Sequence, residues 1–199
     1  SQAVEIESEA ITIWADGARL QGNIFKPAGL KPDEKVPGIL LVHGWGGEKK
    51  HINQAYAPQF AQLGFMVLTF DFRSWGESDG FLVADEVLPP VEEMAPVAVK
   101  GQHVRVIVNP EKMLADARAA LSYLVGEPNV QADNIGIWGT SLGGGIALVT
   151  AAKDSRIKAL VTQIGAVDNK TNWAMIPAAM ASQWETQRAR GEITPFPGP

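Results

Sequence analysis

The most informative stretch of the chain is a serine flanked by glycines, Gly139-Thr140-Ser141-Leu142-Gly143. The run before it, residues 134–138, is short and apolar, as is typical of a buried strand. The run after it, residues 144–153, is apolar, contains several alanines and is long enough for a helix. A strand, a sharp turn and a helix with serine at the apex form a nucleophile elbow. Small residues flank the serine because a side chain there would clash where the chain crowds against itself.

The same Gly-x-Ser-x-Gly pattern occurs a second time, at Gly76-Glu77-Ser78-Asp79-Gly80. The residues before this second match are polar, and residues 81–90 after it carry two prolines and no helical continuation. We therefore interpret Ser78 as a loop serine and Ser141 as the functional one.

Length and composition indicate one soluble globular domain. The 199 residues can bury a substantial core, and 46% hydrophobic with 20% charged residues is ordinary for such a protein. The net charge of −5 argues against nucleic acid or an anionic membrane surface as a partner, and no apolar run is long enough for a membrane span. The absence of cysteine excludes disulfides and thiolate chemistry but leaves the compartment undecided. The three histidines are too scattered to suggest a metal site, and we expect neither metal nor cofactor.

The hydrophobic periodicity predicts an α/β fold. In chain order we expect a hairpin of strands 4–14 and 20–25, a strand over 36–42, a polar loop over 48–53, a helix over 55–63, a strand over 65–70, a helix over 110–125, the elbow strand and its helix, and a buried strand over 157–164. Fully apolar strands that alternate with helices indicate a mostly parallel, doubly wound sheet with helices on both faces. Ligands of such sheets bind at the carboxyl ends of the strands. His43–Gly47, Asp71–Ser78 and Ser141 all fall at such ends.

The chain divides into a core over residues 1–168 and a segment over 169–199. The core carries an insertion over 81–108, in which a small hairpin about Lys100-Gly101 is expected from residues 96–100 and 103–108. A lid and a surface decoration are equally open interpretations of this insertion. The second segment is expected to start a cap, with helices within 172–190, and to end in a Pro-rich tail.

The chemistry expected at Ser141 is nucleophilic attack on a carbonyl. A serine hydroxyl becomes a good nucleophile only when a neighbouring base takes its proton, and the oxyanion formed then needs hydrogen-bond donors. One donor of an elbow is the backbone N–H of the next residue, Leu142. The second is expected from the loop after the first core strand, residues 43–47, where the N–H of Trp45 is placed to point inward. An ordinary Gly-rich turn is the alternative interpretation of that loop.

The chain resembles an α/β-hydrolase of the esterase and serine-peptidase branch, which includes dienelactone-hydrolase-like proteins and dipeptidyl-peptidase relatives. The matching pieces arrive in family order from about residue 10 to residue 168: Leu41–Gly47, Asp71–Ser78, Asp116–Leu124 and the elbow. The resemblance implies hydrolysis of a carboxylic ester, or of an amide, through an acyl-enzyme on Ser141. Ser74 is a departure, because relatives usually carry glycine there, and we expect it to affect the shape of the loop only.

The resemblance also implies where the other catalytic groups do not lie. In the family the order is serine, then acid, then histidine, whereas His43, His51 and His103 all precede Ser141. His43 is expected to shape the oxyanion loop, and His103 to lie on the surface of the insertion. Asp168 stands where some relatives place the acid, although most place it one strand later. We therefore expect the general base and the acid to lie outside this chain.

By this resemblance the chain contains roughly the first two-thirds of an α/β-hydrolase. The strand over 157–164 would then be a long apolar edge, and we expect a companion chain or a missing segment to complete the fold. Two alternatives to an ester hydrolase stay open. One is a non-catalytic half-hydrolase that acts as a binding or scaffold module, and the other is an acyltransferase that uses the same residues.

Overall fold

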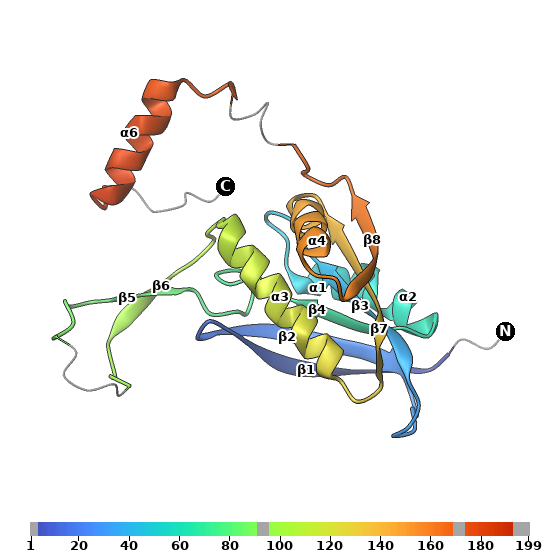
Figure 1. Ribbon diagram of the computed structural model, residues 1–199. Coiled ribbons are helices and arrows are strands. Elements are labelled where there is room, and N and C mark those ends of the chain that lie inside the picture. Colours follow the sequence, from blue (N-terminus) through green and yellow to red (C-terminus); the bar gives the residue numbers. More distant parts are fainter. Residues whose placement is uncertain (1–3, 91–95, 169–173, 193–199) are drawn as a thin grey trace.

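The computed structural model describes residues 4–90, 96–168 and 174–192. Its core is a six-stranded sheet in the order β1-β2-β4-β3-β7-β8 (Figure 1). The strands are β1 (Ile6–Ala15), β2 (Ala18–Pro27), β3 (Val36–Val42), β4 (Met66–Phe70), β7 (Val130–Thr140) and β8 (Ile157–Gln163). The pairs β4/β3, β3/β7 and β7/β8 are parallel, whereas β1 pairs antiparallel with β2 and β2 with β4. The predicted α/β fold, with its N-terminal hairpin and mostly parallel sheet, is confirmed.

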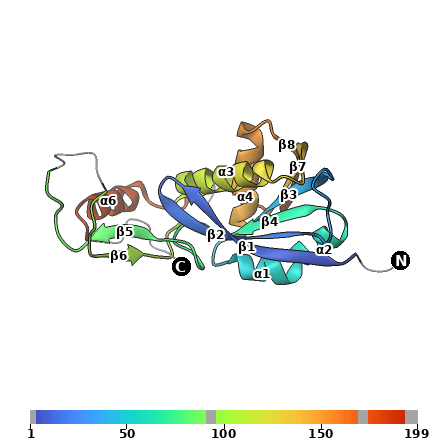
Figure 2. The same ribbon diagram turned by 90° about the horizontal axis from the view of Figure 1, so that it is seen from below.

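Helices cover both faces of this sheet, as Figure 2 shows. On one face lie α3 (Pro110–Gly126) and α4 (Leu142–Lys153), and on the other lie α1 (Lys49–Ala55) and α2 (Ala57–Gln62). The larger apolar cluster includes Leu121 and Leu124 of α3, and the smaller one includes Ile52 of α1. Burial of apolar side chains in these two clusters supplies the main stabilisation of the core.

One predicted loop is a helix. Residues 48–53 were expected to be irregular, but α1 begins at Lys49, and the helix expected over 55–63 is the shorter α2. Two contacts explain this: Ile52 is buried against the sheet, and the backbone N–H of Lys49 donates to the carboxylate of Asp71 at 2.7 Å. One cap on the first turn thus comes from a residue 22 positions away, and Glu48 with His51 forms a local capping box in which histidine replaces the usual Glu or Gln.

The hairpin in the insertion is also different from the one expected. β5 (Phe81–Ala84) pairs antiparallel with β6 (Gly101–Val104), so residues 96–100 are not the partner of 103–108. The Lys100-Gly101 pair was interpreted as a turn, but Gly101 lies within the ladder, opposite Ala84. A Cβ at Gly101 would lie 2.5 Å from the carbonyl oxygen of Val83, so glycine here permits a close approach of two strands.

β8 is an edge strand with little cover. The prediction of a buried strand over 157–164 is wrong in its burial, because residues 158–163 are all exposed, including Leu160 and Val161. β8 is the last strand of the sheet and carries the exposed apolar residues Leu160 and Val161. This agrees with the expectation of an apolar edge.

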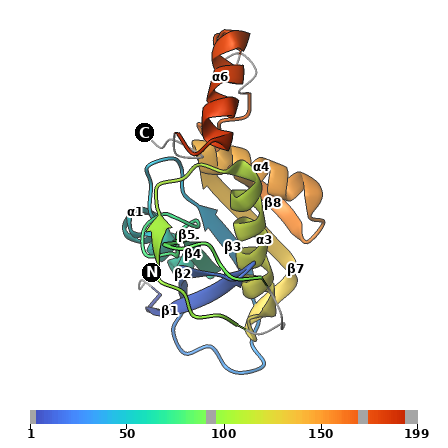
Figure 3. The same ribbon diagram turned by 90° about the vertical axis from the view of Figure 1, so that its left-hand side faces the viewer.

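The segment after the core projects away from it. Helix α6 (Ala178–Ala189) has no buried residues and stands off the end of the core from which β8 emerges (Figures 1 and 3). The division at residue 168 and the role of a cap stay predictions, and tail residues 193–199 lie outside the described residues. Within the described part, none of the helices combines the length and apolarity that a membrane crossing requires.

Candidate active site

Ser141 occupies the turn between β7 and α4 with an unusual backbone. Its φ is 53° and its ψ is −123°, in a region that residues other than glycine rarely adopt. Hydrogen bonds hold this conformation from the edge of the sheet. The N–H of Ser141 donates to the carbonyl of Gln163 at 2.9 Å, and its carbonyl accepts from the N–H of Ala166 at 2.9 Å. Strain of this kind concentrates at functional sites.

The glycines around Ser141 are required by backbone contacts. A Cβ on Gly139 would lie 2.3 Å from the carbonyl oxygen of Gly143. A Cβ on Gly143 would lie 2.2 Å from the carbonyl oxygen of His43. Both neighbours are main-chain atoms in regular elements or at their ends, so neither can move away cheaply. The serine is therefore at the apex of a turn that only small flanking residues permit.

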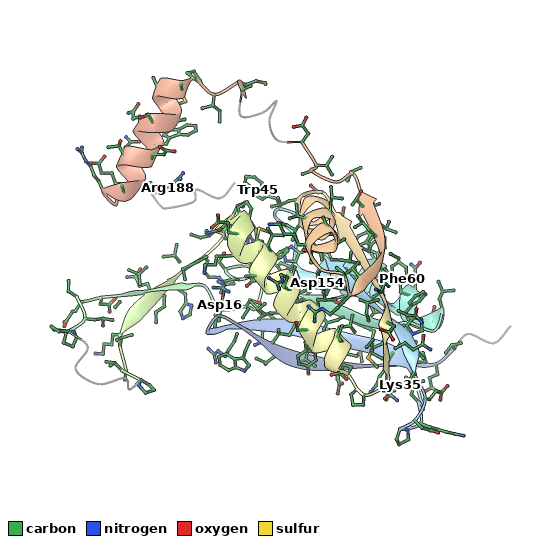
Figure 4. The ribbon with its side chains drawn as sticks, in the orientation of Figure 1. Asp16, Lys35, Trp45, Phe60, Asp154 and Arg188 are labelled. Carbon is green, nitrogen blue, oxygen red and sulfur yellow. The ribbon has the colours of Figure 1, made fainter. Side chains whose placement is uncertain are left out.

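The loop after β3 lies directly beside this turn. A Cβ on Gly44 would lie 3.0 Å from Cβ of Ser141 and 3.6 Å from its Oγ. Ser141 itself is half-buried, and the next loop residue, Trp45, is 49% exposed. Figure 4 shows Trp45 at the end of the core that faces α6. The structure thus brings the loop and the elbow together, while the roles of Trp45 and Leu142 as oxyanion donors stay predictions.

His43 is held in a structural role. It is 2% exposed, its Nε2 accepts the N–H of Phe72 at 3.1 Å, and its Nδ1 lies 2.9 Å from the carbonyl oxygen of Gly44. Because Nε2 is the acceptor, Nδ1 carries the proton and donates to that carbonyl. Burial lowers the pKa of His43, more than the nearby Asp71 charge raises it. Both ring nitrogens are engaged away from Ser141, which agrees with the exclusion of His43 as the base.

The other two histidines make hydrogen bonds within their own parts of the chain. Nδ1 of His51 accepts the N–H of Glu48 in the first turn of α1, and Nδ1 of His103 accepts the N–H of Gly80 at the base of the β5–β6 hairpin. Among the described residues, no hydrogen bond joins a histidine to Ser141. Asp168 is exposed in the loop after β8. That the general base and the acid lie outside this chain stays a prediction.

Ser78, the serine of the second glycine pattern, is a buried structural residue. It is 1% exposed, its Oγ donates to the carbonyl of Asp71 at 2.7 Å, and the same oxygen accepts the N–H of Gln21 at 2.9 Å. The hydroxyl is fully used within the loop that it stabilises.

Two residues make contacts at the carboxyl end of the parallel strands that the sequence did not predict. Asp116 of α3 accepts the N–H of Arg73 at 2.9 Å and its Nη2 at 2.8 Å, and burial raises the pKa of Asp116 despite the opposing charge of Arg73. Ser74 has a φ of 71°, a conformation that favours glycine, and its Oγ accepts the N–H of Ile107 at 2.9 Å. The departure from glycine at position 74 thus adds a contact to the insertion. The sequence match over Asp116–Leu124 included Asp116, but it did not reveal that Arg73 is the hydrogen-bond partner of this residue.

The arrangement of sheet, elbow and adjacent glycine loop defines an α/β-hydrolase. Residues 16–189 match the family model described as X-Pro dipeptidyl-peptidase (S15 family), and the chain belongs to this family.

Individual relatives extend well beyond this chain. The quorum-quenching protein AidA of Acinetobacter baumannii (strain MDR-ZJ06) is 30% identical over 143 residues, which cover 71% of this chain and 40% of AidA. The thiohydrolase aneE of Aspergillus aculeatus is 26% identical over 174 residues, covering 87% of this chain and 46% of aneE. The crystal structure of hypothetical protein PA2218 from Pseudomonas aeruginosa superposes with a TM-score of 0.71 at 25% identity, covering 99% of this chain and 56% of PA2218. The chain thus spans about half the length of these relatives or less.

The contacts of the elbow glycines generate a stability prediction. Gly139→Ala should lower the free energy of unfolding by about 2–3 kcal/mol, because the added methyl group meets fixed backbone. Gly136→Ala on the same strand is the matched control, since its Cβ would lie 3.7 Å or more from its neighbours and should cost little. Urea denaturation measures both. Equal effects of the two substitutions would contradict the account of the turn.

The burial of His43 generates a prediction about pH. Its pKa in the folded protein lies below the value of about 6.5 in the unfolded chain, so the folded state stays neutral at that position while the unfolded state gains a proton. This contribution to stability is complete above about pH 6.5 and declines as the pH falls further. Imidazole ¹⁵N NMR at pH 6 should show a neutral ring protonated at Nδ1. A doubly protonated His43 at that pH would refute the structural role.

Proposed function

We propose that this protein is a serine hydrolase that cleaves a carboxylic ester, or an amide, of a small molecule through an acyl-enzyme on Ser141. The observation that carries the proposal is the positive φ of Ser141 at the β7–α4 turn, with Gly44 of the neighbouring loop beside its hydroxyl. A turn strained in this way is costly, and a serine without chemistry would not require it. The family match and a relative named as a thiohydrolase support hydrolysis as the class of reaction.

The proposed reaction has two steps. A base takes the proton of Oγ of Ser141 as this oxygen attacks the carbonyl carbon, and the oxyanion accepts hydrogen bonds from the N–H groups of Leu142 and Trp45. Collapse of the tetrahedral species breaks the bond to the leaving group, which takes up the proton. Water, activated by the same base, then releases the acid and restores the serine. No step requires a metal or a cofactor.

The exposed edge strand β8 is the proposed contact surface for the polypeptide that would supply the base. We propose that it pairs with the outer edge of β8, either as a companion chain or as a further segment of this protein. Leu160 and Val161 of β8 are 37% and 53% exposed, and Leu148 and Val149 of the adjacent α4 are also exposed. Strands in parallel sheets are normally covered on both faces. A covering strand and helix would bury this surface and bring new side chains to the carboxyl end of the sheet.

Two other functions use the same site. An acyltransferase would differ only in passing the acyl group to an alcohol in place of water. A non-catalytic binding module is favoured by the absence of a histidine at Ser141 among the described residues. The next experiment separates this last alternative from an enzyme.

Ser141 should react with a fluorophosphonate probe in the protein as isolated from its cells, with any companion polypeptide present. Peptide mapping should find the adduct on Ser141 and not on Ser78, whose hydroxyl is buried and engaged. Ser141→Ala should abolish labelling and reduce ester turnover at least about a thousandfold while leaving the unfolding midpoint nearly unchanged. A folded protein that stays unlabelled would support the binding module instead.

The exposed edge of β8 generates a second prediction. Residues 1–199 alone should self-associate and bind a hydrophobic dye, and Val161→Lys should reduce both because a charge disfavours edge pairing. Thr12→Lys on β1, at the opposite edge of the sheet, is the control and should change neither. Size-exclusion chromatography with light scattering measures the association. A monodisperse species of 21.3 kDa that binds no dye would count against a covering segment.

A further inference from the structure

The loop that lies beside Ser141 is attached at both ends to the end of β4. It leaves β3 at His43 and enters α1 at Lys49. At the first end, Nε2 of His43 accepts the N–H of Phe72 at 3.1 Å, and at the second, the N–H of Lys49 donates to Oδ1 of Asp71 at 2.7 Å. Asp71 and Phe72 are consecutive residues that directly follow β4, so both ends of the loop are hydrogen-bonded to the same short segment.

The carboxylate of Asp71 is itself held rigidly. It is 1% exposed, and its second oxygen accepts the N–H of Glu77 at 3.0 Å. Gly76 comes so close that a Cβ there would lie 2.3 Å from the Asp71 carboxyl carbon. The ammonium of Lys49 lies 3.8 Å from the same carboxylate and also contacts Glu77. A buried carboxylate with this many donors has little freedom to rotate, and it transmits its position to the group that it binds.

Within the loop, Gly44 packs against Ser141 and accepts from Nδ1 of His43, whereas a Cβ on Gly46 would meet nothing within 4 Å. The internal hydrogen bond of the loop runs from the N–H of Gly47 to the carbonyl of Gly44 at 3.1 Å, Gly46 has a φ of 70°, and Trp45 is half-exposed. Glycines allow many backbone conformations. We therefore expect the direction of the Trp45 N–H to depend on the two attachments more than on the loop itself.

We propose that Asp71 is a positioning residue for the reaction at Ser141: its carboxylate fixes the distal end of the loop 43–49 and thereby the place of the Trp45 N–H. This inference rests on the proposed function and deepens it. Asp71 does not touch the reacting atoms. It acts through the N–H of Lys49, and displacement of an oxyanion donor by about 1 Å is enough to slow such a reaction by about a hundredfold.

The experiment removes the N–H of Lys49 without removing the carboxylate. Lys49→Pro deletes that donor at the first position of α1, where proline suits a helix, and the preceding Glu48 already has the extended backbone that proline requires. Lys49→Ala is the matched control, because it deletes the same side chain and its ion pairs but keeps the N–H. Asp71→Asn provides a second test of the carboxylate, with Asp154→Asn at the far end of α4 as its control for the loss of a buried acid.

The rate of phosphonylation of Ser141 at saturating probe is the first measurement. Lys49→Pro should react at least about tenfold more slowly than Lys49→Ala, with the probe concentration for half-maximal rate unchanged and the final extent of labelling complete. Asp71→Asn should be slowed in the same way, and Asp154→Asn should react like the wild type. Loss of folded protein alone would lower the final extent of labelling but not the rate of the reactive fraction. Equal rates for Lys49→Pro and Lys49→Ala would overturn the proposal.

Amide hydrogen exchange over residues 43–49 is the second measurement, and it does not depend on chemistry at Ser141. Exchange in this loop should be faster in Lys49→Pro and Asp71→Asn than in their controls. If the wild type were not labelled, the proposed function would fail, and this measurement would still decide whether Asp71 holds the loop. Unchanged exchange in both variants would overturn the positioning role by itself.

Discussion

The contact on which the site depends is the close approach of three backbone segments around Ser141. The end of β7 touches the first turn of α4 at Gly139 and Gly143, and that turn in turn touches the end of β3 at His43. Each contact is between main-chain atoms, so it leaves no room for a side chain. The positive φ of Ser141 lies at the centre of this packing, and Gly44 lies beside the hydroxyl. The packing of these elements therefore determines the geometry available for a reaction at Ser141.

Hydrogen bonds of buried polar side chains hold these segments in place relative to one another. His43, Asp71 and Asp116 are all buried, and each accepts a backbone N–H from a different element or loop. Buried polar groups of this kind are costly unless they are hydrogen-bonded, and here they join β3, β4, α1 and α3 at one end of the sheet. These buried groups therefore maintain the shape of this end of the sheet.

The sequence was sufficient for the features that local patterns encode. Apolar strands, the elbow and the proline-started helix α3 are visible because each has its own period or its own glycines. The start of α1 was missed because one cap is the distant Asp71 and the local capping box has His51 where Glu or Gln is usual. The β5–β6 pairing was missed because Gly101 permits the close approach of two strands and does not form a turn. The exposure of β8 depends on what lies beside the strand, which its own apolar residues do not reveal.

The most direct test of the account is a crystal structure of the protein phosphonylated on Ser141. One phosphonyl oxygen should lie about 2.7–3.1 Å from the backbone nitrogens of both Leu142 and Trp45, with loop 43–49 still attached to Asp71. A phosphonyl group whose oxygens all point to solvent, with the Trp45 N–H turned away, would contradict it.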